Sequence, residues 1–502
     1  MENTISPATH THPEWRMAAI QKDSENDDGK VFTVDLEMVD RHPKLKEKIP
    51  RNMRFDLRET SEGEVQIAKY HSYCALLEIP SEIEHDGKRY SVTSIGDGAI
   101  AWSSIDALYI PDSVRTVGDR AMADCRNLSW VKIGNSVTSI GKYAFSSCPE
   151  LKSVEVPDSV RSVGDGAFAF CNGLERVSIG TGLESIGEIP FLSDSGLKGI
   201  TVSAGNPYYA SADGVLFTKD MRRLIRYPPG RKGPVYEIPK GVTHVEGSAF
   251  ESCKGLEQLD IPDSVMYMGD GTFRGSGIGC FSVSENNTSY RSADGIIFSK
   301  DMKELVAFPP RSKIREYNVP DPVTSIGDCA FATCEGLESV RLPGSLESIG
   351  TKAFADCYLL QMIELPETLR YIGERAFMHC TALESVSVPD PVTSIGEETF
   401  CGCCSLRWLR LSRNLTEIGR CAFQMCGTLE SLDIPNSVKC IGDRAFDGCE
   451  SLKGTVTIPE GVIDMGEGVF GSISKMNDIE VICPPHVKRM SLFSFEDQRM
   501  VD

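Results

Sequence analysis

The chain has 502 residues and a formal net charge of −20, from 72 acidic and 52 basic residues. This balance argues against nonspecific binding to nucleic acids or anionic membranes, because both need a basic face. No run of 18 apolar residues occurs, so no transmembrane helix and no membrane insertion are expected. The N-terminus lacks the apolar core of a secretory signal, which predicts a cytoplasmic protein.

The first segments of the chain differ in character. Residues 1–52 begin polar and acidic and show little apolar periodicity, so we expect a disordered or poorly ordered tail. Residues 53–94 alternate apolar and polar positions around a turn at Glu62-Gly63, which predicts a hairpin. We interpret this second segment as an N-terminal cap, because a stack of repeats must cover its open end.

A repeat of 23 residues occupies residues 95–482. Its clearest marker is one cysteine per repeat, and ten of the 18 cysteines share this slot: Cys125, Cys148, Cys171, Cys253, Cys334, Cys357, Cys380, Cys403, Cys426 and Cys449. A fixed period between 20 and 30 residues indicates a solenoid. In a stack this slot becomes a column of small buried side chains, so we expect unpaired thiols that act as small hydrophobes.

Each repeat has three parts, seen in residues 151–171. Leu151 to Pro157 alternates apolar and polar residues, as a strand does, and the proline ends it. A second short alternation, Val160 to Val163, ends at a glycine. The spacing of Ala, Phe and Cys in Ala167 to Cys171 predicts one inward-facing helical turn.

The motif C-x-x-L-x-x-V-x-I-P-x-x-V-x-x-I-G-x-x-A-F, over roughly residues 76–482, resembles the BspA-like type of leucine-rich repeat. The resemblance implies a β-rich solenoid of the α/β leucine-rich repeat type. Its curved parallel sheet would line the concave side, with short second strands and helical turns on the convex side. It also implies a secreted or cell-surface location as the alternative to the cytoplasm, and adhesion to host matrix or cell-surface proteins.

Two insertions, about 203–235 and 284–316, interrupt the period and are copies of each other, 81 residues apart. Each contains two apolar runs around Lys-Asp-Met, which predicts a β-hairpin. The first insertion is basic and aromatic, and we expect it to bind a partner through Tyr208, Tyr209, Arg223, Arg226 and Tyr227. A purely structural role for both hairpins is the alternative. Residues 483–502 lose the motif and are interpreted as a C-terminal cap or tail.

On the predicted strand, residues beside the inward-facing apolar positions point to solvent. Exposed Trp and Arg are enriched at binding hot spots, although a single exposed Trp is common. The candidate partner-binding residues on these strands are Trp130, Lys132, Arg176, Arg341, Met362, Arg407, Trp408 and Arg410.

No nucleotide-binding, hydrolase or metalloprotease motif is present, so we expect no enzyme activity and no cofactor. The dense cysteines between Cys401 and Cys449 leave a metal-binding or enzymatic protein as a weak alternative, because C-x-C-C is a poor zinc motif. The sequence therefore favours a monomeric, non-enzymatic protein that binds a protein partner, either as an adhesin or as an intracellular scaffold or effector.

Overall fold

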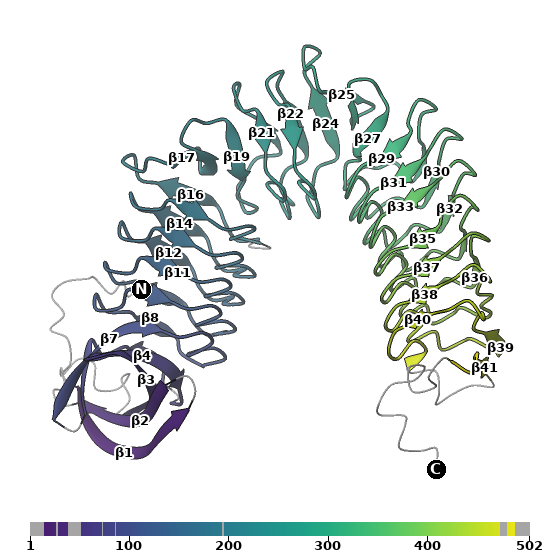
Figure 1. Ribbon diagram of the computed structural model, residues 1–502. Helices are drawn as coiled ribbons and strands as arrows, with labels where there is room; N and C mark the ends of the chain where they lie inside the picture. The colour runs from purple at the N-terminus through teal and green to yellow at the C-terminus, as the bar shows by residue number, and fades with distance from the viewer. Residues whose placement is uncertain are drawn as a thin grey trace. The chain divides into compact units, whose positions relative to one another are not determined.

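The computed structural model describes residues 15–26, 29–38, 52–72, 74–85, 87–192, 195–471 and 479–486. The chain divides into two compact units, Met1–Arg231 and Lys232–Asp502. Both are built of coils that stack in sequence order, as Figure 1 shows for each unit. Neighbouring coils pair in parallel with a shift of one repeat, so that Ser339 lies opposite Met362. This pairing confirms the solenoid that the 23-residue period predicts.

Each coil has three sides, which the coil that starts at Ser339 illustrates. A strand of three or four residues, here Ser339–Arg341 (β30), forms the long-strand face. A strand of two residues, here Ser348–Ile349 (β31), forms the short-strand face. The segment with the Ala-Phe-x-x-Cys pattern, here 353–357, forms the turn face.

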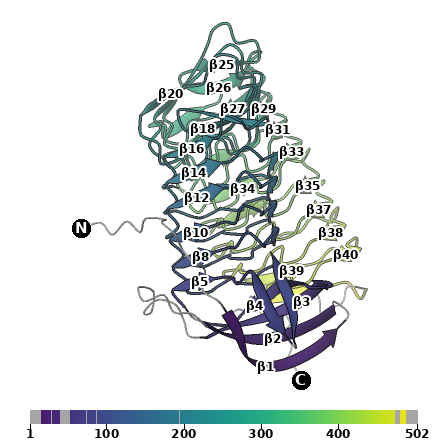
Figure 2. The ribbon, with the colours of Figure 1, turned by 90° about the vertical axis from the view of Figure 1, so that its left-hand side faces the viewer.

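The first unit contains nineteen strands among its described residues. Its cap comprises β1 (Trp15–Asn26), β2 (Gly29–Met38), β3 (Asn52–Ser61), β4 (Glu64–Tyr70), β6 (Glu82–His85) and β7 (Lys88–Ile95). Its long-strand face comprises β5 (Leu76–Glu78), β8 (Ala107–Tyr109), β10 (Trp130–Lys132), β12 (Ser153–Val156), β14 (Arg176–Ile179) and β16 (Gly199–Val202), which follow one another in Figure 2. Its short-strand face comprises β9 (Thr116–Val117), β11 (Ser139–Ile140), β13 (Ser162–Val163) and β15 (Ser185–Ile186). Its insertion comprises β17 (Tyr209–Ala212), β18 (Val215–Thr218) and β19 (Arg223–Arg226).

The second unit repeats the same plan. Its long-strand face comprises β20 (Val235–Glu237), β22 (Gln258–Ile261), β24 (Cys280–Val283), β28 (Glu316–Asn318), β30, β32 (Met362–Glu364), β34 (Ser385–Ser387), β36 (Trp408–Arg410), β39 (Gly454–Thr457) and β41 (Ile479–Ile482). Its short-strand face comprises β21 (His244–Val245), β23 (Tyr267–Met268), β29 (Ser325–Ile326), β31, β33 (Tyr371–Ile372), β35 (Ser394–Ile395), β37 (Glu417–Ile418), β38 (Cys440–Ile441) and β40 (Asp464–Met465). Its insertion comprises β25 (Tyr290–Ala293), β26 (Ile296–Ser299) and β27 (Glu304–Ala307).

The cap extends further toward the N-terminus than the sequence predicts. The antiparallel pair β3–β4 confirms the hairpin at Glu62-Gly63. Strands β1 and β2 also pair, and β2 pairs with β3. The expectation of disorder is therefore wrong for Trp15–Asn26 and Gly29–Met38, since edge pairing with β3 orders chain that has little periodicity of its own. The remainder of 1–51 lies outside the described residues, as does most of 483–502.

The turn face is not helical, which corrects the predicted helical turn; the described residues contain strands and turns but no α-helix. In the segment 329–333, Cys329, Phe331 and Thr333 donate their N–H groups to the next coil at 2.7–2.9 Å. Cys329 and Thr333 have φ values of 56° and 61°. These left-handed residues turn alternate N–H groups away from the helical i→i−4 path and toward the neighbouring coil.

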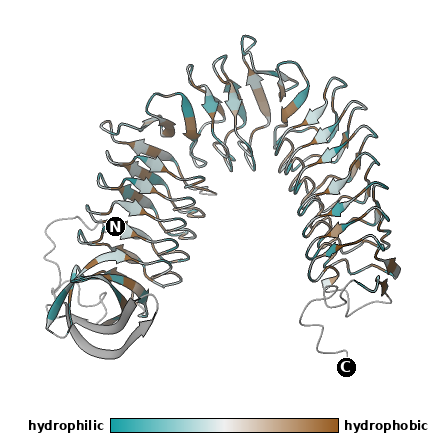
Figure 3. Cartoon of the chain, in the orientation of Figure 1, coloured by the Kyte–Doolittle hydropathy of each residue, from teal (hydrophilic) through white to brown (hydrophobic). Residues whose placement is uncertain are grey.

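The core of each unit is a set of parallel columns of buried side chains. In the second unit, successive phenylalanine rings from Phe331 to Phe470 stack with centroids 4.7–5.7 Å apart. All ten repeat cysteines are buried and unpaired, as the period predicts. Figure 3 shows the resulting alternation of hydrophobic and hydrophilic residues along the coils.

The repeat Ile-Gly pair keeps the coils close together. A Cβ atom on Gly373 would lie 2.5 Å from the backbone of Gly350 in the preceding coil, so only glycine fits there. Side chains add bonds of the same range: Asp328 accepts a hydrogen bond from the N–H of Thr351 at 2.6 Å, and Ser345 donates to the carbonyl of Val323 at 2.8 Å. Each coil is therefore held by its immediate neighbours.

Both insertions form the predicted β-hairpins and add a third strand. In the first, β17 pairs with β18, which pairs with β19, all antiparallel. In the second, β25, β26 and β27 do the same. The third strand arises because Tyr209–Ala212 and Tyr290–Ala293 are extended immediately before each hairpin.

Candidate interaction surfaces

The long-strand face presents most of the residues expected to bind a partner. Trp130, Met362 and Trp408 are 48%, 67% and 52% exposed, although they lie on hydrogen-bonded strands. Large apolar side chains on a rigid backbone lose little conformational entropy when a partner covers them.

The charged candidates on this face differ in how they are held. Arg176, Arg341 and Arg407 are exposed. Lys132 and Arg410 are partly buried, and each forms an ion pair on the surface: Lys132 with Glu155 at 3.8 Å, and Arg410 with Asp390 at 3.5 Å. Surface pairs of this kind contribute little to stability, so both cations remain able to exchange partners.

The first insertion is less open than the sequence predicts. Tyr208 and Arg223 are exposed. Tyr209, Arg226 and Tyr227 are buried, so the expectation that they form part of a surface patch is wrong. The hydroxyl of Tyr209 accepts a hydrogen bond from the N–H of Ile186 at 3.0 Å, and Arg226 donates to the carbonyl of Phe191 at 3.0 Å. These three residues attach the insertion to the preceding coils.

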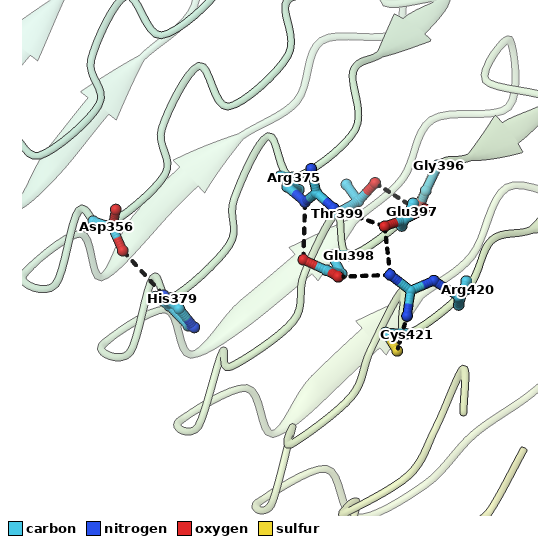
Figure 4. Close-up of polar contacts among 9 residues, drawn as sticks. All are labelled: Asp356, Arg375, His379, Gly396, Glu397, Glu398, Thr399, Arg420 and Cys421. Atoms are coloured by element: carbon cyan, nitrogen blue, oxygen red, sulfur yellow. Dashed lines mark hydrogen bonds and ion pairs between the residues drawn. The ribbon is translucent and has the colours of Figure 1, made fainter. Parts of the chain in front are cut away.

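The turn face carries a network of charged residues that sequence reasoning missed, shown in Figure 4. Arg375 pairs with Glu398 at 2.9 Å and with Glu397 at 2.7 Å. Arg420, one coil further along, pairs with the same two carboxylates at 3.2 and 2.7 Å. Hydrogen bonds to Arg420 lower the pKa of Glu397. The network links three successive coils, and its sequence signal is opposite charge at positions about one period apart.

A second polar cluster on the turn face is centred on Asp356. Its carboxylate contacts Arg274 at 2.8 Å and the ring of His379 at 3.0 Å. Burial raises the pKa of Asp356, but the hydrogen bonds from His379 and Arg274 outweigh burial and lower it overall. Arg274 lies 82 residues away in the chain, which explains why no local pattern revealed the contact.

A small cavity of about 80 Å³ lies near this cluster, between Met268 and Ala332. Asp270, Glu304 and Asp328 line it. Burial, followed by repulsion from Asp328, raises the pKa values of both Asp270 and Glu304. No group of three or more potential ligands in the described part of the chain could hold a metal ion, Cys401 and its neighbours included.

Comparison with known proteins identifies the repeat. A family model of the BspA type leucine rich repeat region matches in six copies, over residues 93–209, 235–299, 305–428 and 372–501. The chain belongs to the BspA-type leucine-rich repeat family. No curated protein sequence is significantly similar to this family member.

Several solved structures resemble this BspA-type chain. A leucine rich cell surface protein from Faecalibacterium prausnitzii is 24% identical, with 88% of this chain and 96% of that chain covered and a TM-score of 0.39. A leucine-rich repeat protein from Eubacterium ventriosum is 17% identical over 88% and 96%, with a TM-score of 0.47. The pneumococcal vaccine antigen PcpA is 19% identical over 87% and 98%, with a TM-score of 0.38.

The BspA-type repeat explains the cysteine column chemically. The thiols of Cys357, Cys380, Cys403, Cys426 and Cys449 donate hydrogen bonds to phenylalanine carbonyls of the preceding coil at 3.0–3.3 Å. Burial raises the pKa of Cys403 far above its ordinary value. Because the thiolate is the reactive form, these cysteines are inert structural residues. His379, next to Cys380 in sequence, contacts Asp356 instead.

Two asparagines that the sequence analysis overlooked attach the insertions of this BspA-type protein. Asn287 is fully buried and makes four hydrogen bonds of 2.8–2.9 Å, to the carbonyls of Pro262 and Val265 and from the N–H groups of Ser289 and Tyr290. Asn206 occupies the same place 81 residues earlier. The repeated asparagine was the available signal. Among the described residues, no helix is both long and apolar enough to cross a bilayer.

Proposed function

We propose that this BspA-type protein is a non-enzymatic binding protein that holds a protein partner on its long-strand face. The observation that carries the proposal is the exposure of Trp408 and Met362 on paired strands of one face. Arg341 and Arg407 add exposed charge at neighbouring positions. Buried aromatic anchors surrounded by polar residues are typical of binding hot spots.

The insertions provide a second contact area in this proposal. Tyr208 is 49% exposed and Arg223 is also exposed, whereas the buried residues of the same insertion fix their position. On the long-strand face of the first unit, Trp130 with Lys132 and Arg176 offers a further contact.

Adhesion at a cell surface is the biological role that the family resemblance favours. An intracellular scaffold or effector is the second candidate, because the cysteines in the described part of the chain form no disulfide, as expected in a reducing compartment. Fractionation of the native host, together with the oxidation state of these thiols, distinguishes the two roles.

A capture experiment tests the binding proposal. The immobilised chain is exposed to host and matrix proteins, and bound partners are identified for the parent, Trp408→Ala and Met362→Ala. We expect both variants to lose the same partner. Trp102→Ala is the matched control, because Trp102 is 72% exposed but lies on the turn face. Retention of every partner by the Trp408 and Met362 variants would refute the role of this face.

A further inference from the structure

Two adjacent columns of side chains on the second unit's long-strand face alternate with a period of two coils. One column reads Ser339, Met362, Ser385, Trp408, Ser431, and the column beside it reads Glu338, Gln361, Glu384, Arg407, Glu430. A serine next to a glutamate thus alternates with a bulky residue next to a neutral or basic one.

Backbone bonds hold these columns in register. The N–H groups of Gln361, Glu384 and Arg407 donate to the carbonyls of the preceding coil at 2.8, 3.4 and 2.9 Å. Ser385 lies directly opposite Trp408 in the parallel sheet. The alternation is therefore a property of the surface and not only of the sequence.

The repeat length of this surface matches one backbone conformation. Neighbouring strands lie about 4.8 Å apart, so positions two coils apart are separated by about 9.6 Å. A polyproline II helix repeats every three residues, or about 9.3 Å. From Ser339 to Ser431 the surface spans four coils, about 19 Å, and six residues of polyproline II span about 18.6 Å.

Other backbone conformations do not keep this register. An extended strand presents one face every two residues, or about 6.6 Å. An α-helix presents one face every seven residues, or about 10.5 Å, and falls out of step by about 2 Å over the same four coils.

The charges on this surface define the ligand further. Glu384 and Glu430 lie one coil before and one coil after Arg407, and both are exposed. Neither carboxylate forms an ion pair with another described residue, whereas Glu338 pairs with Arg315. Two uncompensated carboxylates thus flank the Trp408 coil, and they complement a ligand that carries basic side chains.

The first unit provides an internal comparison. Trp130 lies between two short side chains, Ala107 and Ser153, so the alternation of size is present there too. The flanking positions of the neighbouring coils are Asp106 and Lys152, whose charges are opposite. This surface has the apolar spacing but lacks the net negative charge.

We infer that the face formed by coils 338–431 binds a proline-rich segment of a protein partner in the polyproline II conformation, with basic residues that contact Glu384 and Glu430. Its side chains lie over the serines and pack between Met362 and Trp408. This inference rests on the proposed function and specifies the class of partner.

Binding of synthetic peptides to the full-length chain tests the inference. The probe is a proline peptide of about ten residues with an arginine at each end, which covers the four coils. A glycine-serine peptide with the same arginines and a proline peptide with glutamines at its ends are the comparison ligands. Calorimetry measures affinity, and the Trp408 fluorescence of a variant with the other three tryptophans replaced by phenylalanine reports the location.

We expect the arginine-proline peptide to bind best. Trp408→Ala should weaken it about tenfold or more, and Ser385→Trp, which fills a short position, should do the same. Glu384→Gln with Glu430→Gln should weaken it by about three- to tenfold, without changing binding of the glutamine-ended peptide. Ser153→Trp, at the matching position beside Trp130, should have no effect.

Equal binding of the glycine-serine peptide, or full binding by Trp408→Ala, would overturn the inference. If no proline peptide binds but Trp408→Ala still loses its captured partner, the inference fails and the proposed function stands. If a captured partner depends on Trp408 and its binding segment is helical or a strand, the inference also fails. Loss of the captured partner on competition with the arginine-proline peptide supports both.

Discussion

The stacked phenylalanines of the second unit give a quantitative prediction about how the coils stabilise one another. The rings of Phe354 and Phe400 lie 5.2 Å on either side of Phe377, within 2° of parallel. An aromatic pair contributes about 0.5–1.5 kcal/mol beyond the burial of its area. Phe377→Leu retains an apolar side chain but loses both ring contacts, so it should destabilise this region by about 1–3 kcal/mol.

A double-mutant cycle isolates the contact itself. Phe377→Leu combined with Phe400→Leu should show a coupling of about 0.5–1.5 kcal/mol. Phe331→Leu combined with Phe423→Leu, four coils apart, should be additive within about 0.5 kcal/mol.

The buried thiols provide the assay for this cycle. Each column cysteine becomes reactive only when its coil opens, so thiol labelling at low denaturant, read by peptide mass spectrometry, gives a local opening free energy. Cys380 and Cys403 report on the Phe377 and Phe400 coils. Zero coupling for the adjacent pair, or equal coupling for the distant pair, would refute the nearest-neighbour account.

Three further predictions concern other parts of the chain. Asn287→Ala should destabilise the second unit by about 3 kcal/mol or more, because it strands buried carbonyl and N–H groups; urea unfolding measures this, and no loss would contradict the anchoring role. The folded-state pKa of Asp356 is lowered, so its stabilisation is complete above the ordinary carboxyl pKa of about 4 and disappears as the pH falls below it. Asp356→Asn should therefore be less stable than the parent at pH 7 and equal to it near pH 3, and a constant difference across that range would show the contrary. In the native protein, iodoacetamide should label Cys280 and Cys404, which are exposed, long before the ten column cysteines; early labelling of the column would disprove its burial.

The repeat architecture was predictable because its determinants are periodic. The 23-residue step of Cys357 and its equivalents, and the strand-like alternation before each proline, both appear directly in the sequence. The helical turn was predicted wrongly because Ala, Phe and Cys at this spacing face inward either on a helix or on a left-handed turn such as that at Cys329. Hydrogen bonds to the next coil decide between the two, and no local pattern contains them.

The candidate surfaces were predicted unequally for a similar reason. Trp130 and Trp408 are exposed, as the alternation on a strand predicts. In the first insertion, Tyr209, Arg226 and Tyr227 have polar or amphipathic side chains that suggested a surface, but packing against earlier coils buries them. The contact between Arg274 and Asp356 spans 82 residues, which lies beyond any spacing that a single sequence makes visible.

The register of the coils constrains how the length of this protein can change. Every repeat bonds to a neighbour about 23 residues away, so gain or loss of a whole coil leaves the backbone scaffold complete. The alternation of Met362 and Trp408 with serines has twice that step, since these two residues are 46 positions apart. Removal of one coil would bring two large or two small residues together, whereas removal of a pair would preserve the pattern. Length variants that differ by an even number of coils should therefore retain the same ligand preference.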